Sequence, residues 1–307
     1  MSGNPVILPG SAPQSRVVPY GWGKGAMELV KIHLSLYIAV SAIAGHALAH
    51  GHAGFHSLFL GGWVLALACG AAAWNNIQDR RWDRAMPRTR NRVLARKMFP
   101  LFHAKAIALG LTCAGLTGLF VFYDSAVPLV MGIIALVCYN GLYTPVKKTS
   151  LWAMVPGIVC GMIPPAIGWT AVPEPIASAD VSGLVLLMAA LGFWQLPHYL
   201  LVCLKTPLSE SKKAIPGFMN IWSVREIKCQ VLIWTVLFSL VMMLFLLRGW
   251  VDTPWIRWSV FFTSLALPTA MAGLIQGKKA LRHPLLCFGL LNLSMLLFLS
   301  AAVLDRI

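Results

Sequence analysis

Apolar residues recur along this chain in runs of about 18–24 residues, each long enough to cross a lipid bilayer as an α-helix. Only short polar connections separate the runs, which leaves no room for a separate soluble domain. The pattern predicts an all-α, polytopic membrane protein with nine transmembrane helices. The predicted helices cover residues 28–49, 57–76, 101–122, 126–143, 152–172, 181–203, 229–248, 255–276 and 284–304. We expect residues 1–27 to form a flexible cytoplasmic leader and residues 28–307 a single membrane domain.

The composition agrees with this pattern and excludes several classes of protein. Hydrophobic residues make up 58% of the chain and charged residues 11%, whereas soluble domains carry about 25% charged residues. These values exclude a soluble enzyme, a disordered chain and a nucleic-acid binder with membrane anchors. The net charge of +15 could indicate a polyanion partner, but the places of the charges suggest another origin.

The basic residues lie almost entirely in connections that the predicted spans place on one side of the membrane. Of the 25 Lys and Arg residues, only Arg248, Arg257 and Arg306 fall on the other side. Positively charged connections stay in the cytoplasm, so we expect the N-terminus inside and the C-terminus outside, in a bacterial inner membrane. Topology therefore explains much of the net charge.

The cysteines and most histidines offer little chemistry. Seven isolated cysteines without a CxxC pair argue against a disulfide framework or a zinc site. His46, His50, His52 and His56 cluster at the first connection on the outer side. They could bind a metal or present a haem, or they could be ordinary loop and core histidines.

A polar stretch at the end of the second apolar run is the strongest candidate site. Asn75, Asp79 and Asp83 are spaced i, i+4 and i+8, which places three oxygen ligands on one face of a helix. Carboxylates at the edge of an apolar span are costly and usually functional. Two acids and an amide suit Mg²⁺, which commonly bridges acids to a substrate phosphate, and Arg88 and Arg92 follow as phosphate ligands. The alternative is a solvated helix end in which the two acids pair with Arg80, Arg84 or Arg88.

Four blocks of this sequence together resemble the UbiA superfamily of intramembrane prenyltransferases, and within it the protohaem IX farnesyltransferases. The blocks are Asn75 to Arg92, Tyr143-Thr144-Pro145-Val146-Lys147-Lys148-Thr149, Gly161 to Trp169 with its Pro164-Pro165 pair, and Trp194-Gln195-Leu196-Pro197-His198-Tyr199. They occur in family order over roughly residues 28–304. The resemblance implies nine helices around a central cavity.

The resemblance also implies roles for individual residues. Asn75, Asp79 and Asp83 would hold Mg²⁺ against farnesyl diphosphate, while the diphosphate would be neutralised by a basic set with an adjoining tyrosine: Arg88, Arg92, Tyr143, Lys147 and Lys148. The haem substrate would lie against Trp194, Gln195 and His198, although His198 could equally be a hydrogen-bonded core residue. Lys205, Lys212 and Lys213 could pair with haem propionates or be topology charges only.

Two positions depart from the family pattern. Where the family has Arg-Pro-Leu after its first motif, this chain has Arg92-Val93-Leu94. In the sixth connection the expected acid falls on Ser209, with Glu210 beside it. Glu210 could supply a second metal site, one metal could suffice, or the activity could be altered.

The expected reaction is transfer of a farnesyl group to a vinyl group of protohaem IX with addition of water, giving haem O for oxidase maturation. A downstream haem A synthase or oxidase assembly protein is the candidate partner, and no nucleic acid is expected. Two alternatives stay open. The chain could prenylate an aromatic quinone precursor, or it could be a haem-binding membrane protein without catalysis.

Overall fold

The computed structural model describes residues 21–86, 89–172, 180–205, 222–275 and 283–307, and these segments contain helices and no strands. Nine stretches within them are long and apolar enough to cross a membrane, which confirms the predicted number. The helices are α1 (Trp22–Leu29), α2 (Ile32–His50), α3 (Phe55–Ala85), α4 (Leu101–Val121), α5 (Val127–Leu136), α7 (Met154–Thr170), α8 (Ser182–Lys205), α10 (Val224–Leu247), α11 (Pro254–Ile275) and α12 (Pro284–Leu304). Between α5 and α7 the chain forms a π-helix η1 (Val137–Tyr143), the short helix α6 (Thr144–Val146) and a 3₁₀ turn η2 (Leu151–Ala153).

Two predicted helix boundaries differ from the structure. The first predicted span, residues 28–49, is interrupted because Lys31 adopts a left-handed conformation with φ of 48° between α1 and α2. Residues 22–27 of the predicted leader are helical, residues 1–20 lie outside the described segments, and the division into leader and domain stays a prediction. The second span continues to Ala85 rather than ending near residue 76, because its polar residues are buried against other elements.

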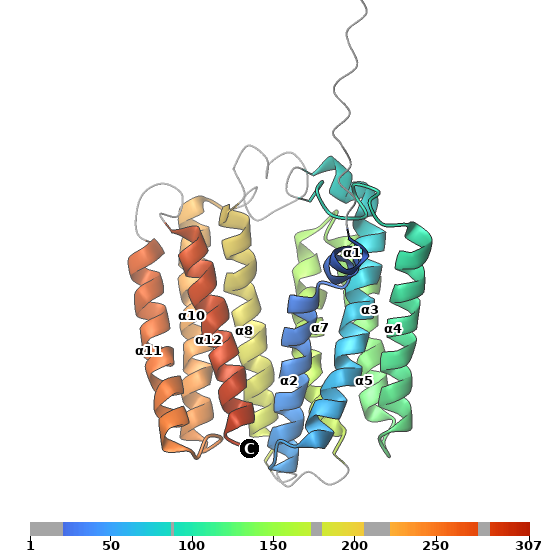
Figure 1. Ribbon diagram of the computed structural model, residues 1–307. Helices are drawn as coiled ribbons and strands as arrows, with labels where there is room; N and C mark the ends of the chain where they lie inside the picture. Colours follow the sequence, from blue (N-terminus) through green and yellow to red (C-terminus); the bar gives the residue numbers. More distant parts are fainter. Residues whose placement is uncertain (1–20, 87–88, 173–179, 206–221, 276–282) are drawn as a thin grey trace, which may run out of the picture.

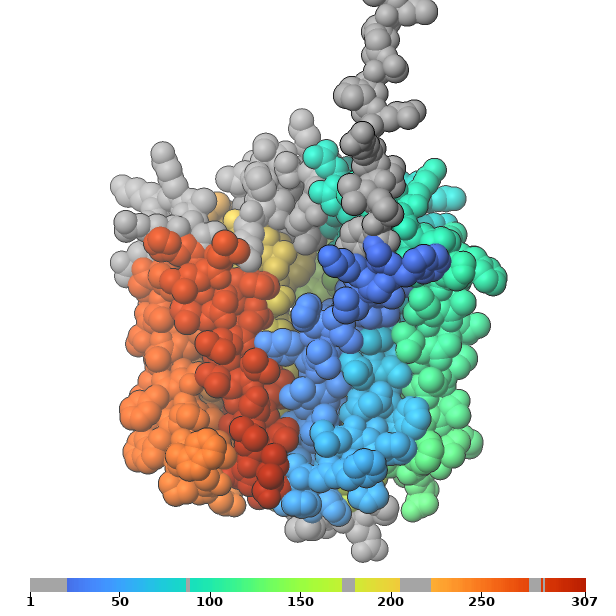
Figure 2. All heavy atoms as spheres, viewed as in Figure 1, coloured from blue at the N-terminus to red at the C-terminus, as the bar shows by residue number. Residues whose placement is uncertain are grey.

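The helices stand side by side, with α8, α10, α11 and α12 grouped beside α2, α3, α4, α5 and α7 (Figure 1). Large apolar side chains cover the outside of the bundle, including Phe102 at 77% and Leu247 at 70% exposure. Figure 2 shows one face of the bundle, on which side chains of α2, α3, α4, α11 and α12 lie. Lipid contact explains such exposure along nine apolar helices, and the protein is a multi-pass membrane protein.

The two ends of the bundle differ. Helix α1 and the connection from α3 to α4 lie at one end, and the C-terminus lies at the other (Figure 1). At the C-terminal end, the Asp305 carboxylate accepts hydrogen bonds from the backbone N–H groups of Asp252 and Thr253. Arg306 donates to the Trp250 carbonyl at 3.2 Å and so ties the chain end to the connection between α10 and α11. Which end faces the cytoplasm stays a prediction from the charges.

Glycines allow α2 and α7 to approach closely in the middle of the bundle. A Cβ atom on Gly168 would lie 2.0 Å from the Ala42 carbonyl oxygen, and one on Gly45 would lie 2.1 Å from the Pro165 carbonyl oxygen. These neighbours are backbone atoms, so only movement of a whole helix could relieve the contact. Close approach through small residues is a common way to pack helices in lipid.

We expect Gly168→Leu to destabilise the bundle strongly, because overpacking a tight contact costs about 1–3 kcal/mol or more. Gly62 in α3 provides a matched control, since it is exposed and a Cβ atom there meets nothing within 4 Å. Thermal unfolding in detergent should show a lower melting temperature for Gly168→Leu and little change for Gly62→Leu. Equal melting temperatures for the two variants would contradict the packing argument.

Candidate active site

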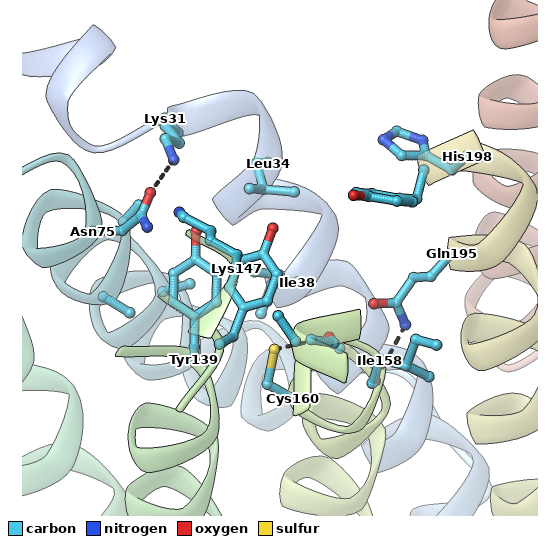
Figure 3. Close-up of a pocket in the computed structure, with 18 of the residues that line it drawn as sticks. Lys31, Leu34, Ile38, Asn75, Tyr139, Lys147, Ile158, Cys160, Gln195 and His198 are labelled. Atoms are coloured by element: carbon cyan, nitrogen blue, oxygen red, sulfur yellow. Dashed lines mark hydrogen bonds between the residues drawn. The ribbon is translucent and has the colours of Figure 1, made fainter. Parts of the chain in front are cut away.

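The predicted polar face of α3 lies at the mouth of a deep cavity. Asn75, Asp79 and Asp83 are 1%, 4% and 5% exposed, and all three line a cavity of about 620 Å³. Their burial excludes the solvated helix end as an explanation of the motif. The cavity runs from these residues past apolar side chains such as Leu34 and Ile38 to the face of α8 (Figure 3).

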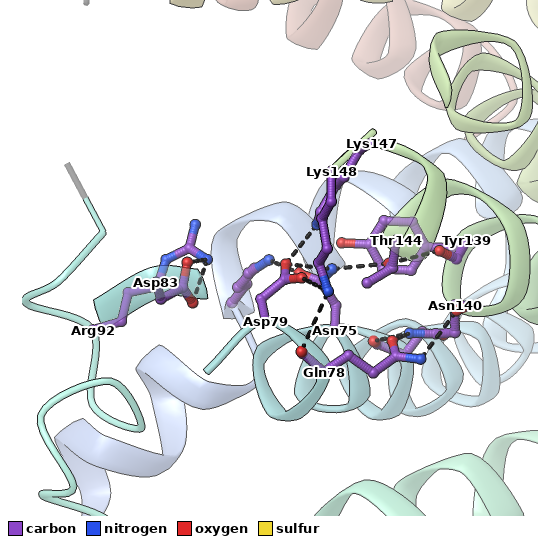
Figure 4. A network of polar contacts seen from close by, with 12 residues as sticks. Asn75, Gln78, Asp79, Asp83, Arg92, Tyr139, Asn140, Thr144, Lys147 and Lys148 are labelled. Carbon is purple, nitrogen blue, oxygen red and sulfur yellow. Dashed lines mark hydrogen bonds and ion pairs between the residues drawn. The ribbon is translucent and has the colours of Figure 1, made fainter. Parts of the chain in front are cut away.

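Asp79 is surrounded by positive charge. The Lys147 Nζ atom lies 2.5 Å from one carboxylate oxygen of Asp79, and the Lys148 Nζ atom lies 3.0 Å from the other. The Asn75 amide donates a further hydrogen bond to Asp79 at 3.1 Å. Figure 4 shows the two lysines approaching Asp79 from the chain that follows η1. The structure therefore brings residues of the first two motif blocks together.

Lys31 is a site residue that the sequence analysis counted only as a topology charge. Its Nζ atom donates to the Asn75 side-chain oxygen at 2.6 Å (Figure 3). The Asn75 amide nitrogen also donates to the Thr144 hydroxyl at 3.0 Å, and Thr144 donates to the Tyr139 carbonyl at 2.7 Å. Asn75 thus holds Asp79 in place, while its oxygen is bound to Lys31.

Asp83 pairs with Arg92 and with neither of the nearer arginines, Arg80 and Arg84. The Arg92 Nη1 atom lies 3.1 and 3.0 Å from the two carboxylate oxygens of Asp83 (Figure 4). Arg80 donates to the Ile77 carbonyl and Arg84 to the Ala95 carbonyl. The structure thereby overturns the expected alternative of local pairs with Arg80 and Arg84, and Arg88 lies outside the described residues.

Burial affects the basic groups at the cavity mouth. Desolvation, together with the nearby charges of Arg92 and Lys147, lowers the pKa of Lys31 to about 7, against the opposing effect of the two aspartates. Desolvation also lowers the pKa of Lys147, although Asp79 counteracts it. The buried cations therefore lack part of the stabilisation that water would supply, and an additional anion in the cavity would provide it.

Aromatic rings form the wall beside the lysines. Tyr143 stacks on Tyr139 with ring centroids 5.6 Å apart and an interplanar angle of 12°. The Lys147 Nζ atom lies 5.0 Å from the centre of the Tyr143 ring. Both tyrosines line the cavity. The π-helix η1, which contains Tyr139 and Tyr143, is the kind of local irregularity that often occurs at functional sites.

The opposite wall is formed by the block from Trp194 to Tyr199 on α8. Trp194, Gln195, His198 and Tyr199 line the cavity, and His198 and Gln195 face it across from Asn75 and Lys147 (Figure 3). The His198 Nδ1 atom lies 2.9 Å from the Asn292 side-chain oxygen of α12. Asn292 escaped the sequence analysis, where it was one polar residue within an apolar span.

Several predicted site residues cannot be placed. Lys212, Lys213 and Glu210 lie outside the described residues, as does the side chain of Lys205, with which α8 ends. The second metal site and the propionate contacts therefore stay predictions.

The histidines of the first connection, which the structure describes, are separate from the residues that line the cavity of about 620 Å³. Within the described segments, no three His, Cys, Asp or Glu side chains come together as metal ligands. His46 is buried with its Nδ1 atom 3.0 Å from the Ser57 hydroxyl, whereas His50, His52 and His56 are exposed. The seven cysteines are free in the described structure.

Residues 38–296 match the UbiA prenyltransferase family. The chain belongs to this family. Among its relatives, the protoheme IX farnesyltransferase of Oleidesulfovibrio alaskensis is 26% identical over 285 residues, covering 92% of this chain and 97% of the relative. The protoheme IX farnesyltransferase of Geobacter sulfurreducens is 39% identical over 177 residues, which cover 56% of this chain and 62% of the relative.

Solved structures of the family share the fold. A UbiA homolog from Archaeoglobus fulgidus bound to GPP and Mg²⁺ has a TM-score of 0.65 at 11% identity, covering 92% of this chain and 99% of that chain. The apo structure of a UbiA homolog from Aeropyrum pernix K1 has a TM-score of 0.66 at 15% identity, covering 89% of this chain and 96% of that chain. This UbiA chain therefore has the family's helical architecture.

We expect Lys147→Met/Lys148→Met to destabilise the protein by roughly 3 kcal/mol, because the buried Asp79 carboxylate would lose both cations. Adding Asp79→Asn should restore much of the stability, since no unpaired charge remains. The exposed Lys105 on α4 supplies the control variant Lys105→Met, for which the melting temperature in detergent should not change. If the triple variant melts no higher than the double variant, charge pairing at Asp79 is not the cause.

Proposed function

We propose that this UbiA chain is a protohaem IX farnesyltransferase, which joins farnesyl diphosphate, protohaem IX and water to give haem O and diphosphate. The main observation that supports this proposal is one cavity lined by three kinds of residue. Its opening contains the buried carboxylates Asp79 and Asp83, its middle is apolar, and the block from Trp194 to Tyr199 forms its far wall. Protoheme IX farnesyltransferases are the named relatives across most of the chain, and this agreement supports haem as the acceptor.

The basic residues at the mouth would bind the diphosphate. Lys147, Lys148 and Arg92 form ion pairs with carboxylates in this structure, and phosphate oxygens can replace these carboxylates as the substrate enters. Arg88 is proposed to join them, and Lys31 lies close enough to Asn75 to add a further positive charge. As the carbon–oxygen bond to C1 of the prenyl chain breaks, these groups stabilise the developing charge on the leaving diphosphate.

The carboxylates suit a divalent cation. Both oxygens of Asp79 already bind positive groups, and the oxygen-only donor set of Asp79 and Asp83 is what Mg²⁺ prefers. A fold neighbour binds GPP and Mg²⁺, which agrees with this assignment. When bound, Mg²⁺ would neutralise diphosphate charge. Asn75 would become a third ligand only if Lys31 released its oxygen, and otherwise it positions Asp79.

The far wall would orient the acceptor. A vinyl carbon of protohaem attacks C1 of the farnesyl group, forming a carbon–carbon bond and leaving a cation on the porphyrin side. Water adds to that cation and loses a proton, which produces the hydroxyl group. The apolar lining of the cavity keeps bulk water from the allylic centre before transfer. Trp194, Gln195 and His198 are proposed to hold the haem, with His198 oriented by Asn292.

The membrane fold and the distribution of basic residues support a proposal for where this reaction takes place. We propose a bacterial inner membrane, with α1 and the charged mouth on the cytoplasmic side and the C-terminus outside, because the basic connections lie at the former end. The product would remain in the bilayer, where a haem A synthase or an oxidase assembly protein could receive it.

Purified protein supplied with farnesyl diphosphate, protohaem IX and Mg²⁺ should form hydroxyethylfarnesyl haem, detected by extraction and mass spectrometry. We expect Asp79→Asn to reduce turnover by at least about 100-fold, because the metal and diphosphate lose a charged ligand. Chelation of divalent cations should stop the reaction, and added Mg²⁺ should restore it. An unchanged melting temperature would separate this loss from unfolding.

Two results would reject the proposal. Formation of a prenylated product from 4-hydroxybenzoate, with none from protohaem, would assign an aromatic acceptor. Haem binding without product under any of these conditions would indicate a non-catalytic haem protein. Full turnover by Asp79→Asn would contradict the role of Asp79 as a metal ligand, but it would leave the proposed acceptor unaffected.

Asn292 provides a separate test of the acceptor wall. We expect Asn292→Leu to raise the KM for protohaem about 10-fold, because the His198 ring would lose its partly buried hydrogen bond to Asn292. The KM for farnesyl diphosphate should change little. A matched increase in both constants would show that Asn292 supports the whole bundle rather than the acceptor wall.

A further inference from the structure

Val93, the departure from the family's Arg-Pro-Leu, has a specific partner in this chain. The backbone N–H of Val93 donates to the Glu28 Oε1 atom at 2.9 Å. A proline at this position has no N–H and could not make the bond. Val93 therefore offers a backbone donor that a proline would lack, and Glu28 accepts from it.

Other contacts near this hydrogen bond hold α1 in place. The Asn76 side chain of α3 donates to the Leu29 carbonyl at 2.7 Å, which fixes the end of α1 one residue from Glu28. Leu29 packs in one buried cluster with Val93, Leu94 and Phe99. At the other end of α1, the Trp22 ring meets the Phe99 ring edge-on at 5.3 Å. Helix α1 therefore contacts the segment from residue 89 to residue 99 through a hydrogen bond, a buried apolar cluster and an aromatic contact.

The same segment carries Arg92 into the site. Glu28, Arg92 and Asp83 line a second cavity of about 320 Å³, so the hydrogen bond at Val93 and the Asp83–Arg92 pair border the same space. Proline restricts its segment by fixing φ near −65°, whereas valine leaves more freedom to be lost on ordering. A bond from Glu28 to the residue directly after Arg92 would supply the missing constraint.

We propose that Glu28 is a positioning residue that holds Arg92 for diphosphate binding and replaces the constraint that proline supplies in the family pattern. This inference rests on the proposed function, in which Arg92 binds the diphosphate. Glu28 acts through the hydrogen bond to the Val93 N–H, so its importance depends on the residue at position 93. Val93 is not among the described non-glycine residues with a positive φ, which are Lys31 and Lys97, so a positive φ does not exclude proline there.

The test compares Glu28→Ala, Glu28→Gln, Val93→Pro and Glu28→Ala/Val93→Pro in the full-length protein. We expect Glu28→Ala to raise the KM for farnesyl diphosphate about 10-fold, with a smaller change in kcat, since Arg92 remains present but less well placed. Glu28→Gln keeps an acceptor oxygen and should stay within about threefold of the unmodified protein. In the Val93→Pro background, Glu28→Ala should change the KM by less than about threefold.

A second measurement needs no turnover. Limited trypsin digestion without substrate reports exposure of the segment from residue 89 to residue 99 through cleavage after Arg90, Arg96 and Lys97. Cleavage after Arg92 is left out of the comparison, because trypsin does not cut a bond that precedes proline and Val93→Pro would remove that site. Cleavage at the other three sites should be faster in Glu28→Ala and return to the original rate when Val93→Pro is added.

The outcomes separate this proposal from the proposed function. If the unmodified protein makes no farnesylated haem but the digestion pattern follows expectation, the function is wrong and the positioning contact stands. If Glu28→Ala is equally harmful with and without Val93→Pro, or if Glu28→Gln is as impaired as Glu28→Ala, Glu28 acts through its charge or through folding and the proposal is overturned.

Discussion

Two buried carboxylates at the edge of an apolar helix bundle set the requirements for the rest of the site. A buried charge is tolerated only where it is paired and hydrogen-bonded. Asp79 meets this requirement with Lys147 and Lys148, and Asp83 meets it with Arg92. The connections after α3 and after α6 must therefore return to the same end of α3. The ion pairs thus bring residues from separate segments of the chain together at the opening of the cavity.

This arrangement also shapes how the site can bind its substrate. The cations are paired with carboxylates in the described structure, so in the proposed reaction a diphosphate would have to exchange with the carboxylates for these cations. A divalent cation would balance that exchange, because it would bind the carboxylates while the phosphate oxygens bind the lysines and the arginine. A monoanion such as an aromatic carboxylate would release fewer of these pairs. The geometry therefore favours a ligand that brings high negative charge together with a metal.

Features that depend on local sequence could be predicted, whereas features that depend on distant pairing could not. Nine apolar runs and the i, i+4, i+8 spacing of Asn75, Asp79 and Asp83 follow from periodicity alone. Lys31 could not be distinguished from a topology charge, because its acceptor Asn75 lies 44 residues away. Asn292 is a still more distant partner, 94 residues from His198. Hydropathy also placed the end of α3 too early, since it registers polar residues as solvent-exposed even where they are buried and paired.

The contact between Glu28 and Val93 shows how a residue distant in the sequence can compensate for a departure from a motif. In the sequence, valine in place of proline gives a more flexible backbone next to Arg92, the proposed phosphate ligand. In the fold, Val93 has a backbone donor one residue from Arg92, and Glu28 of α1 accepts from it. We propose that the hydrogen bond to Glu28 of α1 restricts the backbone at position 93, as the ring of a proline would. Arg92 then depends on α1, so the helix that lies at the charged end of the bundle becomes part of the site's support (Figure 1).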